Sequence, residues 1–208
     1  MLLAIDTSAG TSVAIVDLDG GILAERSSPD PRGHAELIGT FIAECLDESG
    51  VAPSALSGVV SGMGPGPFTG LRVGIAAARA FALGVGRPVV PIASHDAIAF
   101  AAGEHRPLLV TSDARRREVF WSTYSGRDAA GLPVRTAGPA LAKADALADA
   151  VTGFDGYLLL DAGLVSAGAL GMLAETLHAN GRPFAADEPL YLRSPDVTLS
   201  AGPKRVTA

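Results

Sequence analysis

The chain has 208 residues and a hydrophobic fraction of 48%, which fits one large domain or two small ones and excludes a disordered protein. Its formal net charge of −6 opposes binding to the phosphate backbone of a nucleic acid by this chain alone. No stretch approaches the roughly 20 apolar residues of a membrane span, so we expect a soluble, cytoplasmic protein without membrane contact.

The start of the chain predicts an antiparallel meander. LLAID at 2–6 is typical of a short buried strand, residues 12–20 of a second strand with a hairpin signal at 19–20, and residues 21–27 of a third strand. The opening apolar run is too short for a signal peptide, and no basic residues precede it.

A helix is expected over residues 34–49, with Gly50 just past its end. Its apolar side chains cover about half of the helix circumference, more than the ~100° stripe that a one-sided helix needs. They are Leu37, Ile38, Phe41, Ile42, Cys45 and Leu46. Cys45, the single cysteine, is interpreted as a buried structural thiol in a reducing compartment.

The stretch SGMGPGPFTGLRVG at 61–74 joins a strand expected at 57–62 to a helix expected at 70–84, with Thr69 as the N-cap. It fits neither the Walker A pattern nor the dinucleotide pattern GxGxxG. Its two prolines also lack the N–H groups that a phosphate nest uses. The composition therefore favours a rigid turn built for packing over a phosphate cradle.

The helix over 70–84 is apolar almost all round and is interrupted only by Arg72 and Arg79 on one narrow face. Gly70 and Gly74 would let another backbone approach it closely. Two helices with surplus apolar surface could be covered by a second lobe of the same chain, or could form a patch for another protein. The residues alone leave both readings open.

Strands precede mixed helix and strand in each half of the chain, which predicts two α/β lobes of similar size. The elements expected after the second helix are a strand at 88–94, a helix capped by Ser94 that ends at Ala102, two strands joined by a solvated turn at 115–117, a helix at 140–152, a strand at 156–161, a helix at 164–179 and an extended tail at 188–197. The expected division is an N-terminal lobe at 1–105 and a C-terminal lobe at 106–208.

Residues that could carry chemistry are sparse, and no catalytic, metal or cofactor residue is expected. The four histidines are His34, His95, His105 and His178. They show no metal-site spacing, and no nucleophile-elbow motif GxSxG is present. Asp6-Thr7-Ser8 is the best candidate site, because an Asp at a strand end followed by hydroxyls can hold magnesium and nucleotide. The favoured interpretation is that these side chains satisfy N–H groups of the turn.

Five segments, in order along the chain, resemble the bacterial TsaB (YeaZ) proteins. They are LLAIDTSAGTSVAIVD, HAELIGTFI, SGMGPGPFTGLRVGIAAARAFA, SDARRREVFWSTY and EPLYLRSPDV. The core G-P-G-x-F-T-G-L-R is highly specific. Pro67 stands where the family usually carries Ser, and the basic turn at 115–117 also departs from the family pattern.

The resemblance implies an actin/Hsp70-like (ASKHA) α/β fold of two small lobes with mixed sheets. It implies a non-catalytic scaffold that binds TsaD, the subunit that transfers a threonylcarbamoyl group onto the adenosine beside the anticodon of certain tRNAs, with the small ATPase TsaE. Of the metal-binding histidine pair of TsaD, only His34 has a counterpart here. A homodimer of the lone chain through the same surface is implied, with tRNA contact only through the complex.

We expect the partner to dock on the helices at 34–49 and 70–84. The expected interface residues are Leu37, Phe41, Arg72, Val73, Ala77, Arg79 and Ala80. The alternative function is a nucleotide-dependent enzyme of the actin-like fold that uses Asp6, Thr7 and Ser8. A metalloprotease, attached to such folds by analogy, is disfavoured by the missing histidine pair.

Overall fold

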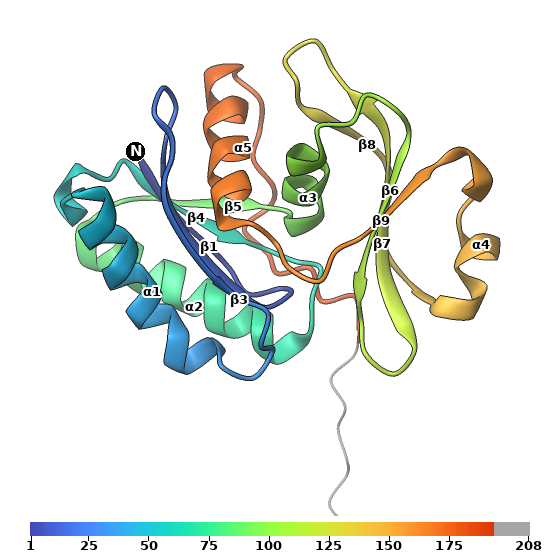
Figure 1. Cartoon of the computed structure of the whole chain (residues 1–208), viewed down its shortest axis with the longest axis horizontal. Coiled ribbons are helices and arrows are strands. Elements are labelled where there is room, and N and C mark those ends of the chain that lie inside the picture. The colour runs from blue at the N-terminus through green and yellow to red at the C-terminus, as the bar shows by residue number, and fades with distance from the viewer. Residues whose placement is uncertain (194–208) are drawn as a thin grey trace, which may run out of the picture.

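The structure is a computed structural model that describes residues 1–193. It contains two mixed sheets that stand next to each other, and helices cover both faces of the first sheet (Figure 1). The predicted fold class, an α/β fold of the actin/Hsp70-like type with two mixed sheets, is confirmed.

The first sheet follows the strand order β3-β2-β1-β4-β5. Its first three strands, β1 (Leu2–Asp6), β2 (Thr11–Asp17) and β3 (Gly21–Ser28), form the predicted antiparallel meander. The strands β4 (Gly58–Gly62) and β5 (Val89–Ile92) extend the sheet in parallel on the other side of β1. Every residue of β1 and β4 is buried, as expected for strands covered by helices on both faces.

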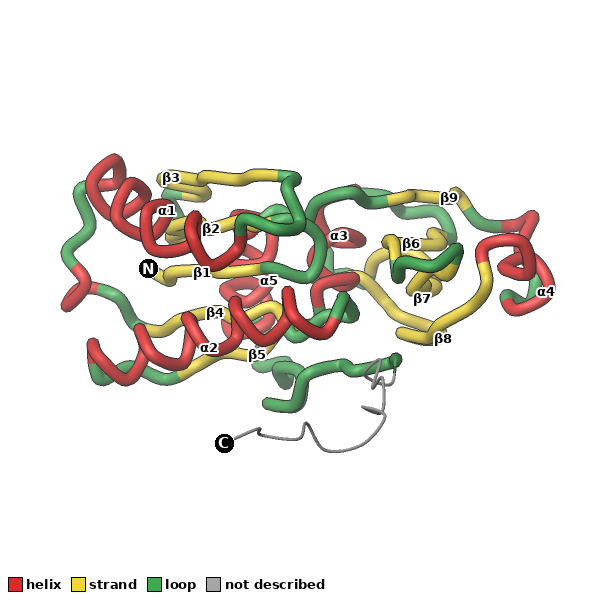
Figure 2. Tube along the Cα trace, turned by 90° about the horizontal axis from the view of Figure 1, so that it is seen from below, coloured by secondary structure: helices red, strands yellow, loops and turns green. Residues whose placement is uncertain are grey.

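Two helices lie side by side on one face of this sheet, α1 (His34–Ser49) and α2 (Phe68–Val85), and α5 (Ala167–Ala179) covers the other face (Figures 1 and 2). On the sheet, α1 contacts β2 and β3, α2 contacts mainly β1 and β4, and α5 contacts mainly β1 and β2. The bounds of α1 match the prediction. Gly50 ends it in the left-handed region (φ 65°), which glycine adopts without steric cost.

Glu25 of β3 fixes the N-terminus of α5 to the sheet. Its Oε1 accepts hydrogen bonds from the Ser166 hydroxyl (2.9 Å), the Gly168 N–H (3.1 Å) and the Ser12 hydroxyl (3.1 Å). The Ser12 oxygen in turn accepts a hydrogen bond from the Ala167 N–H at 2.9 Å. A carboxylate at this place satisfies N–H groups that have no partner within the helix and faces the positive end of the helix dipole. It ties a late helix to the first strands of the chain.

The second sheet has the order β8-β7-β6-β9, with β9 parallel to β6 and the other pairs antiparallel. Its strands are β6 (Leu108–Asp113), β7 (Glu118–Arg127), β8 (Pro133–Lys143) and β9 (Leu158–Asp161). Between the sheets lies α3 (Ser94–Ala102), which contacts α5 on one side and β6, β7 and β8 on the other (Figure 1). One apolar core therefore runs from β1 and β4 through α3 and α5 to β6.

The helix predicted at 140–152 is wrong in its first part, because residues up to Lys143 belong to β8. The short helices are η1 (Pro53–Ala55), η2 (Ala144–Ala146), α4 (Leu147–Ala150) and η3 (Phe154–Gly156). As an edge strand with a largely exposed surface, β8 lacks the apolar–polar alternation that marks a half-buried strand. Its pairing with β7 decides its conformation.

Two predicted helix caps are also wrong. The helix α2 begins at Phe68, so that Thr69 lies inside the helix and not before it. Ser94 is the first residue of α3, and its hydroxyl donates a hydrogen bond to Asp6, a residue 88 positions away in the sequence. A partner that is so distant along the chain leaves no local signal.

The division of the chain into lobes at residue 105 stays a prediction. Residues 167–179, which lie beyond that division, pack on the first sheet as α5, so the second half of the chain contributes to both sheets. The segment that leads into the predicted tail, and the tail itself up to Leu190, lie beside the first sheet, whereas Arg193 reaches Glu118 of the second sheet and the neighbouring Ala114. Beside the first sheet, the Ala185 N–H donates to the Pro91 carbonyl at 3.1 Å and the Leu190 N–H to the Met63 carbonyl at 2.8 Å. Residues 194–197 of that tail lie outside the described residues.

Candidate functional site

A cleft of about 820 Å³ opens between the two sheets. Its lining includes the turn at 7–10 after β1, residues 66–70 at the start of α2, and the turn at 113–116 after β6. Arg115, Arg116 and Arg117 are exposed and lie in the left-handed region with φ of 66°, 53° and 62°. The predicted solvated turn is thus confirmed, and two of its arginines also face the cleft.

Asp6, Thr7 and Ser8, the best candidate site in the sequence, are buried, with exposed fractions of 1%, 2% and 5%. Asp6 Oδ1 accepts hydrogen bonds from the Ser8 N–H (2.8 Å) and the Ser8 hydroxyl (2.6 Å), and Oδ2 accepts one from the Ser94 hydroxyl (2.5 Å). Burial raises the pKa of the Asp6 carboxyl, although the hydrogen bonds from Ser8 and Ser94 act in the opposite direction. Thr7 and Ser8 line the cleft, and Asp6 does not. Asp6 therefore satisfies an N–H group of the turn, as the favoured interpretation predicts. For Thr7 that interpretation is wrong, because its hydroxyl bonds to the Gly70 carbonyl and the Gly74 N–H of α2.

Glycine recurs at every fourth position of the stretch 61–74, and each of these glycines contacts the turn that holds Asp6, Thr7 and Ser8. A Cβ would lie 1.9 Å from Asp6 Oδ2 at Gly62, 2.8 Å from Ser8 Cα at Gly66, 2.6 Å from the Thr7 carbonyl oxygen at Gly70, and 2.2 Å from Thr7 Oγ1 at Gly74. Real Cβ contacts are never this short. The packing interpretation of this stretch is confirmed, and the backbone that approaches α2 closely belongs to the chain itself.

The predicted interface residues all lie on α1 and α2, and the structure brings the two helices together. Ala80, Arg72 and Arg79 are exposed, and Leu37, Phe41, Val73 and Ala77 are half-buried. Leu83, which the sequence analysis missed, is 84% exposed one turn after Ala80. We call these eight residues the outer face of α1 and α2. Whether a partner covers this face stays a prediction.

The sequence left open whether a second lobe covers these helices. In the structure they pack on the first sheet and on each other, and the second sheet stands apart from them (Figures 1 and 2). The C-terminal segment reaches α2: Arg79 forms an ion pair with Asp187 at 2.8 Å, and the Phe68 and Tyr191 rings lie 4.7 Å apart. The guanidinium of Arg72 lies 3.7 Å from the centre of the Phe68 ring. Both arginines thus have partners within the chain at the rim of the outer face.

Within the described residues, α2 is the one helix that is long and apolar enough to cross a membrane by length and composition alone. In this fold it packs on one face of the first sheet. Leu71, Ile75 and Ala78 are buried against the sheet, while Arg72 and Arg79 face away from it.

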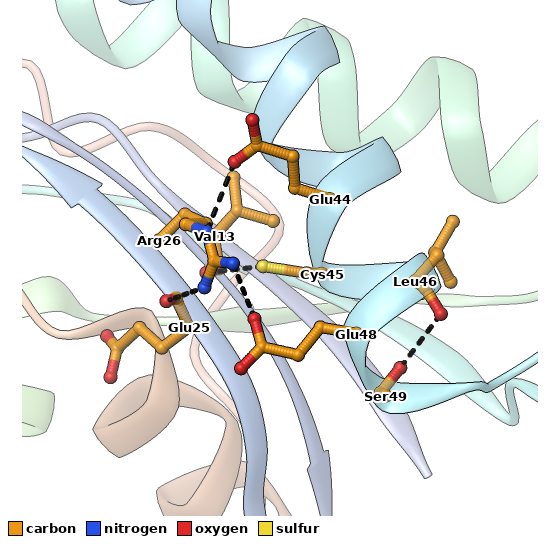
Figure 3. A network of polar contacts seen from close by, with 8 residues as sticks. All are labelled: Val13, Glu25, Arg26, Glu44, Cys45, Leu46, Glu48 and Ser49. Carbon is orange, nitrogen blue, oxygen red and sulfur yellow. Dashed lines mark hydrogen bonds and ion pairs between the residues drawn. The ribbon is translucent and has the colours of Figure 1, made fainter.

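Cys45 is fully buried where α1 meets β2, and its thiol donates to the Val13 carbonyl at 3.4 Å (Figure 3). Burial raises the pKa of the thiol to about 11. Arg26 lies beside it and forms ion pairs with Glu44 (3.1 Å) and Glu48 (2.5 Å) of the same helix face. The prediction of a structural thiol is confirmed.

Cys45 should therefore react with a disulfide reagent such as dithiobisnitrobenzoate only when the protein opens. We expect modification of the folded chain near pH 8 to be slower than that of the urea-unfolded chain by at least about 100-fold, because both the thiolate population and access are low. Absorbance of the released thiolate measures the rate. Modification of the folded chain within the mixing time would contradict the assignment.

The histidines that the structure buries are both held by hydroxyl groups. His95 Nδ1 and Nε2 each lie 2.9 Å from a serine hydroxyl, of Ser122 and Ser112, and His34 Nδ1 lies 2.8 Å from the Thr11 hydroxyl. Burial, with a smaller contribution from Arg135, lowers the pKa of His95 to about 3. Within residues 1–193, no group of three or more His, Cys, Asp or Glu is placed to hold a metal ion.

Acidification should weaken the fold through His95. Its pKa is lowered from 6.5 to about 3, so between these values the unfolded chain binds a proton that the folded chain does not. Stability then falls as the pH falls, with a slope that approaches ~1.4 kcal/mol per pH unit. Urea unfolding of wild type and His95→Gln at a series of pH values measures this. The wild type should show the steeper loss, because Asp6 and Asp96, whose raised pKa acts in the opposite sense, are common to both proteins. Parallel profiles would refute the prediction.

Comparison with known proteins places the chain among relatives of two kinds, TsaD and TsaB. Residues 7–150 match the family model described as TsaD: tRNA N6-adenosine threonylcarbamoyltransferase. The chain is 43% identical over 146 residues to an uncharacterized protein of Mycobacterium leprae, across 68% of this chain and 38% of the relative. It is 33% identical over 135 residues to the tRNA threonylcarbamoyladenosine biosynthesis protein TsaB of Escherichia coli, across 63% of this chain and 57% of that protein. The chain thus spans less than two thirds of the length of either relative.

A solved structure extends the similarity to nearly the whole fold. YeaZ from Pseudomonas aeruginosa superimposes with a TM-score of 0.74 at 27% sequence identity, and the match covers 92% of this chain and 99% of that one. Both mixed sheets and the helices that cover them are therefore shared with a known architecture.

Proposed function

Since the chain belongs to the TsaD/YeaZ family, we propose that it is a non-catalytic subunit that binds a TsaD-like catalytic subunit in the biosynthesis of threonylcarbamoyladenosine in tRNA. A TsaE-like ATPase would join the complex, which would reach tRNA through its other subunits and act in the cytoplasm. The similarity to the Escherichia coli protein named for this pathway supports the proposal.

The non-catalytic part of the proposal is supported by the state of the turn after β1. The Asp6 carboxylate is buried and its oxygens accept three hydrogen bonds from Ser8 and Ser94. A carboxylate that acts on a ligand must instead be reachable from the cleft. The formal charge of −6 also favours contact with a protein partner over direct contact with tRNA.

The observation that carries the proposal is the outer face of α1 and α2. Leu83 is 84% exposed, and the neighbouring Ala76 and Ala80 are exposed as well. Small side chains let a second helix approach closely, and an exposed leucine offers apolar area whose burial by a partner is favourable. Arg72 and Arg79 are held at the rim by Phe68 and Asp187. A partner that fits this face would present helices with an apolar centre, and acidic groups where they meet Arg72 and Arg79. The same face would pair two copies of this chain when the partner is absent.

Nucleoside analysis of tRNA tests the function directly. Deletion of the gene from its source organism should remove most threonylcarbamoyladenosine from hydrolysed tRNA, as measured by mass spectrometry, and expression of the wild-type chain should restore it. A variant with an obstructed outer face should fail to restore it, although the variant is folded. An unchanged content of the modified nucleoside in the deletion strain would refute the proposal.

The alternative, a nucleotide-dependent enzyme, is favoured by one observation: Thr7 and Ser8 line a cleft whose volume of about 820 Å³ would admit a nucleotide. Titration calorimetry with magnesium–ATP on the isolated chain separates the two functions. Tight one-to-one binding would support the enzyme, and no heat of binding would support the subunit.

A further inference from the structure

The hydroxyl of Thr7 bridges two backbone groups of α2. It donates a hydrogen bond to the Gly70 carbonyl at 2.7 Å and accepts one from the Gly74 N–H at 3.0 Å. In an α-helix, the carbonyl of one residue and the N–H four residues later are the pair that the helix itself joins. A side chain that follows β1, at the centre of the first sheet, is therefore inserted at the first turns of a helix more than 60 residues away.

The two glycines make this insertion possible. A Cβ at Gly74 would lie 2.2 Å from the Thr7 hydroxyl oxygen, and one at Gly70 would lie 2.6 Å from the Thr7 carbonyl oxygen. Thr7 is 2% exposed, so water cannot take the place of its hydroxyl without rearrangement. The contact is a specific joint between the sheet and the helix and not a general apolar packing.

The segment that Thr7 holds carries part of the outer face. Phe68 and Arg72 lie in the first turns of α2, Arg72 is exposed, and Val73 is half-buried on the same helix. A side chain that enters a helix hydrogen-bond ladder bends or shifts the helix at that point. The hydroxyl of Thr7 therefore influences where Arg72 and Val73 stand relative to α1.

We propose that Thr7 is a positioning residue for partner docking. Its hydroxyl fixes the position of the first turns of α2, and with them the part of the outer face that the partner contacts. This inference rests on the proposed function. It assigns the Thr7 hydroxyl to the docking helix, where the sequence suggested a contact with nucleotide. A ligand in the cleft would have to compete with Gly70 and Gly74 for this hydroxyl, because Thr7 also lines the cleft.

Two substitutions separate the hydroxyl from the shape of the side chain. Thr7→Val keeps the shape and removes the hydroxyl, and Thr7→Ser keeps the hydroxyl. We expect Thr7→Val to weaken binding to the TsaD-like protein of the same organism by about 10-fold and to speed amide exchange at Gly74, measured by NMR. Thr7→Ser should stay within about 2-fold of wild type in both measurements. If Thr7→Val does not fold, Thr7→Ala is compared with Thr7→Ser, since these two side chains differ by the hydroxyl alone.

A control on the opposite face of the sheet distinguishes positioning from stability. Ser166→Ala removes the N-cap hydrogen bond of α5 to the Ala169 N–H. We expect it to lower the free energy of unfolding about as much as Thr7→Val does, without a change in affinity for the partner. The inference is overturned if Thr7→Val binds as tightly as wild type, or if Ser166→Ala loses as much affinity. If wild type itself does not bind the partner, the proposed function fails. Unchanged Gly74 exchange in Thr7→Val would then reject the positioning role separately.

Discussion

Replacing Ala80 by arginine is expected to weaken the complex with a TsaD-like partner by at least about 100-fold, while the lone chain keeps its stability. Ala80 is exposed on α2, so in the free chain the longer side chain extends into water. At the centre of an interface the same guanidinium would be buried without a partner, which costs several kcal/mol. Titration calorimetry of the purified proteins gives the affinity, and urea unfolding gives the stability.

Ala148→Arg is the matched control. Ala148 is exposed on α4, which lies at the far end of the second sheet from α1 and α2 (Figure 1). This variant should bind the partner like wild type. Changes at Phe41 or Ala77 are less informative, because both residues are half-buried and pack on the core of the first sheet. If Ala80→Arg binds the partner with wild-type affinity, the outer face is not the docking surface.

Two glycines of the same helix should respond to alanine in opposite directions. A Cβ at Gly74 would meet Thr7 Oγ1 at 2.2 Å and its Cβ and Cγ2 at 3.1 Å, so no rotamer of Thr7 relieves the contact. We expect Gly74→Ala to lower the free energy of unfolding by about 2–3 kcal/mol through overpacking and loss of the Thr7 hydrogen bonds. A Cβ at Gly84 meets nothing within 4 Å, and Gly84→Ala should raise stability by about 0.5–1 kcal/mol.

Urea unfolding followed by circular dichroism measures both variants under the same conditions. The comparison is internal to α2, so differences in helix propensity cancel. If Gly74→Ala is as stable as Gly84→Ala, the turn after β1 does not pack against α2 as closely as the distances indicate.

Local sequence patterns were sufficient to predict much of the first sheet. The alternation and turn signals of residues 2–28 specify the meander, and the apolar spacing with Gly50 specifies α1. The strand β8 was missed because an exposed edge strand rich in Ala, Gly and Pro has no alternation of its own. The docking of α5 on the first sheet could not be predicted, since it depends on Glu25 reaching Ser166 across 141 positions.

The candidate site, too, could be predicted from the sequence only in part. The lack of phosphate motifs was enough to predict that the glycine-rich stretch serves packing. The reason for the four glycines needed the structure, because it lies in their contacts with Asp6, Thr7 and Ser8. The exposed Leu83 could have been found from the sequence, since it falls one turn after Ala80 on a helix that is apolar almost all round.

The central claim is that another subunit covers the outer face of α1 and α2. Hydrogen exchange of the chain with and without its TsaD-like partner, followed by mass spectrometry, tests it most directly. We predict slower exchange in peptides from residues 34–49 and 68–85, and unchanged exchange in peptides from β7, β8 and α4. Protection confined to the second sheet, with α1 and α2 unchanged, would contradict the account.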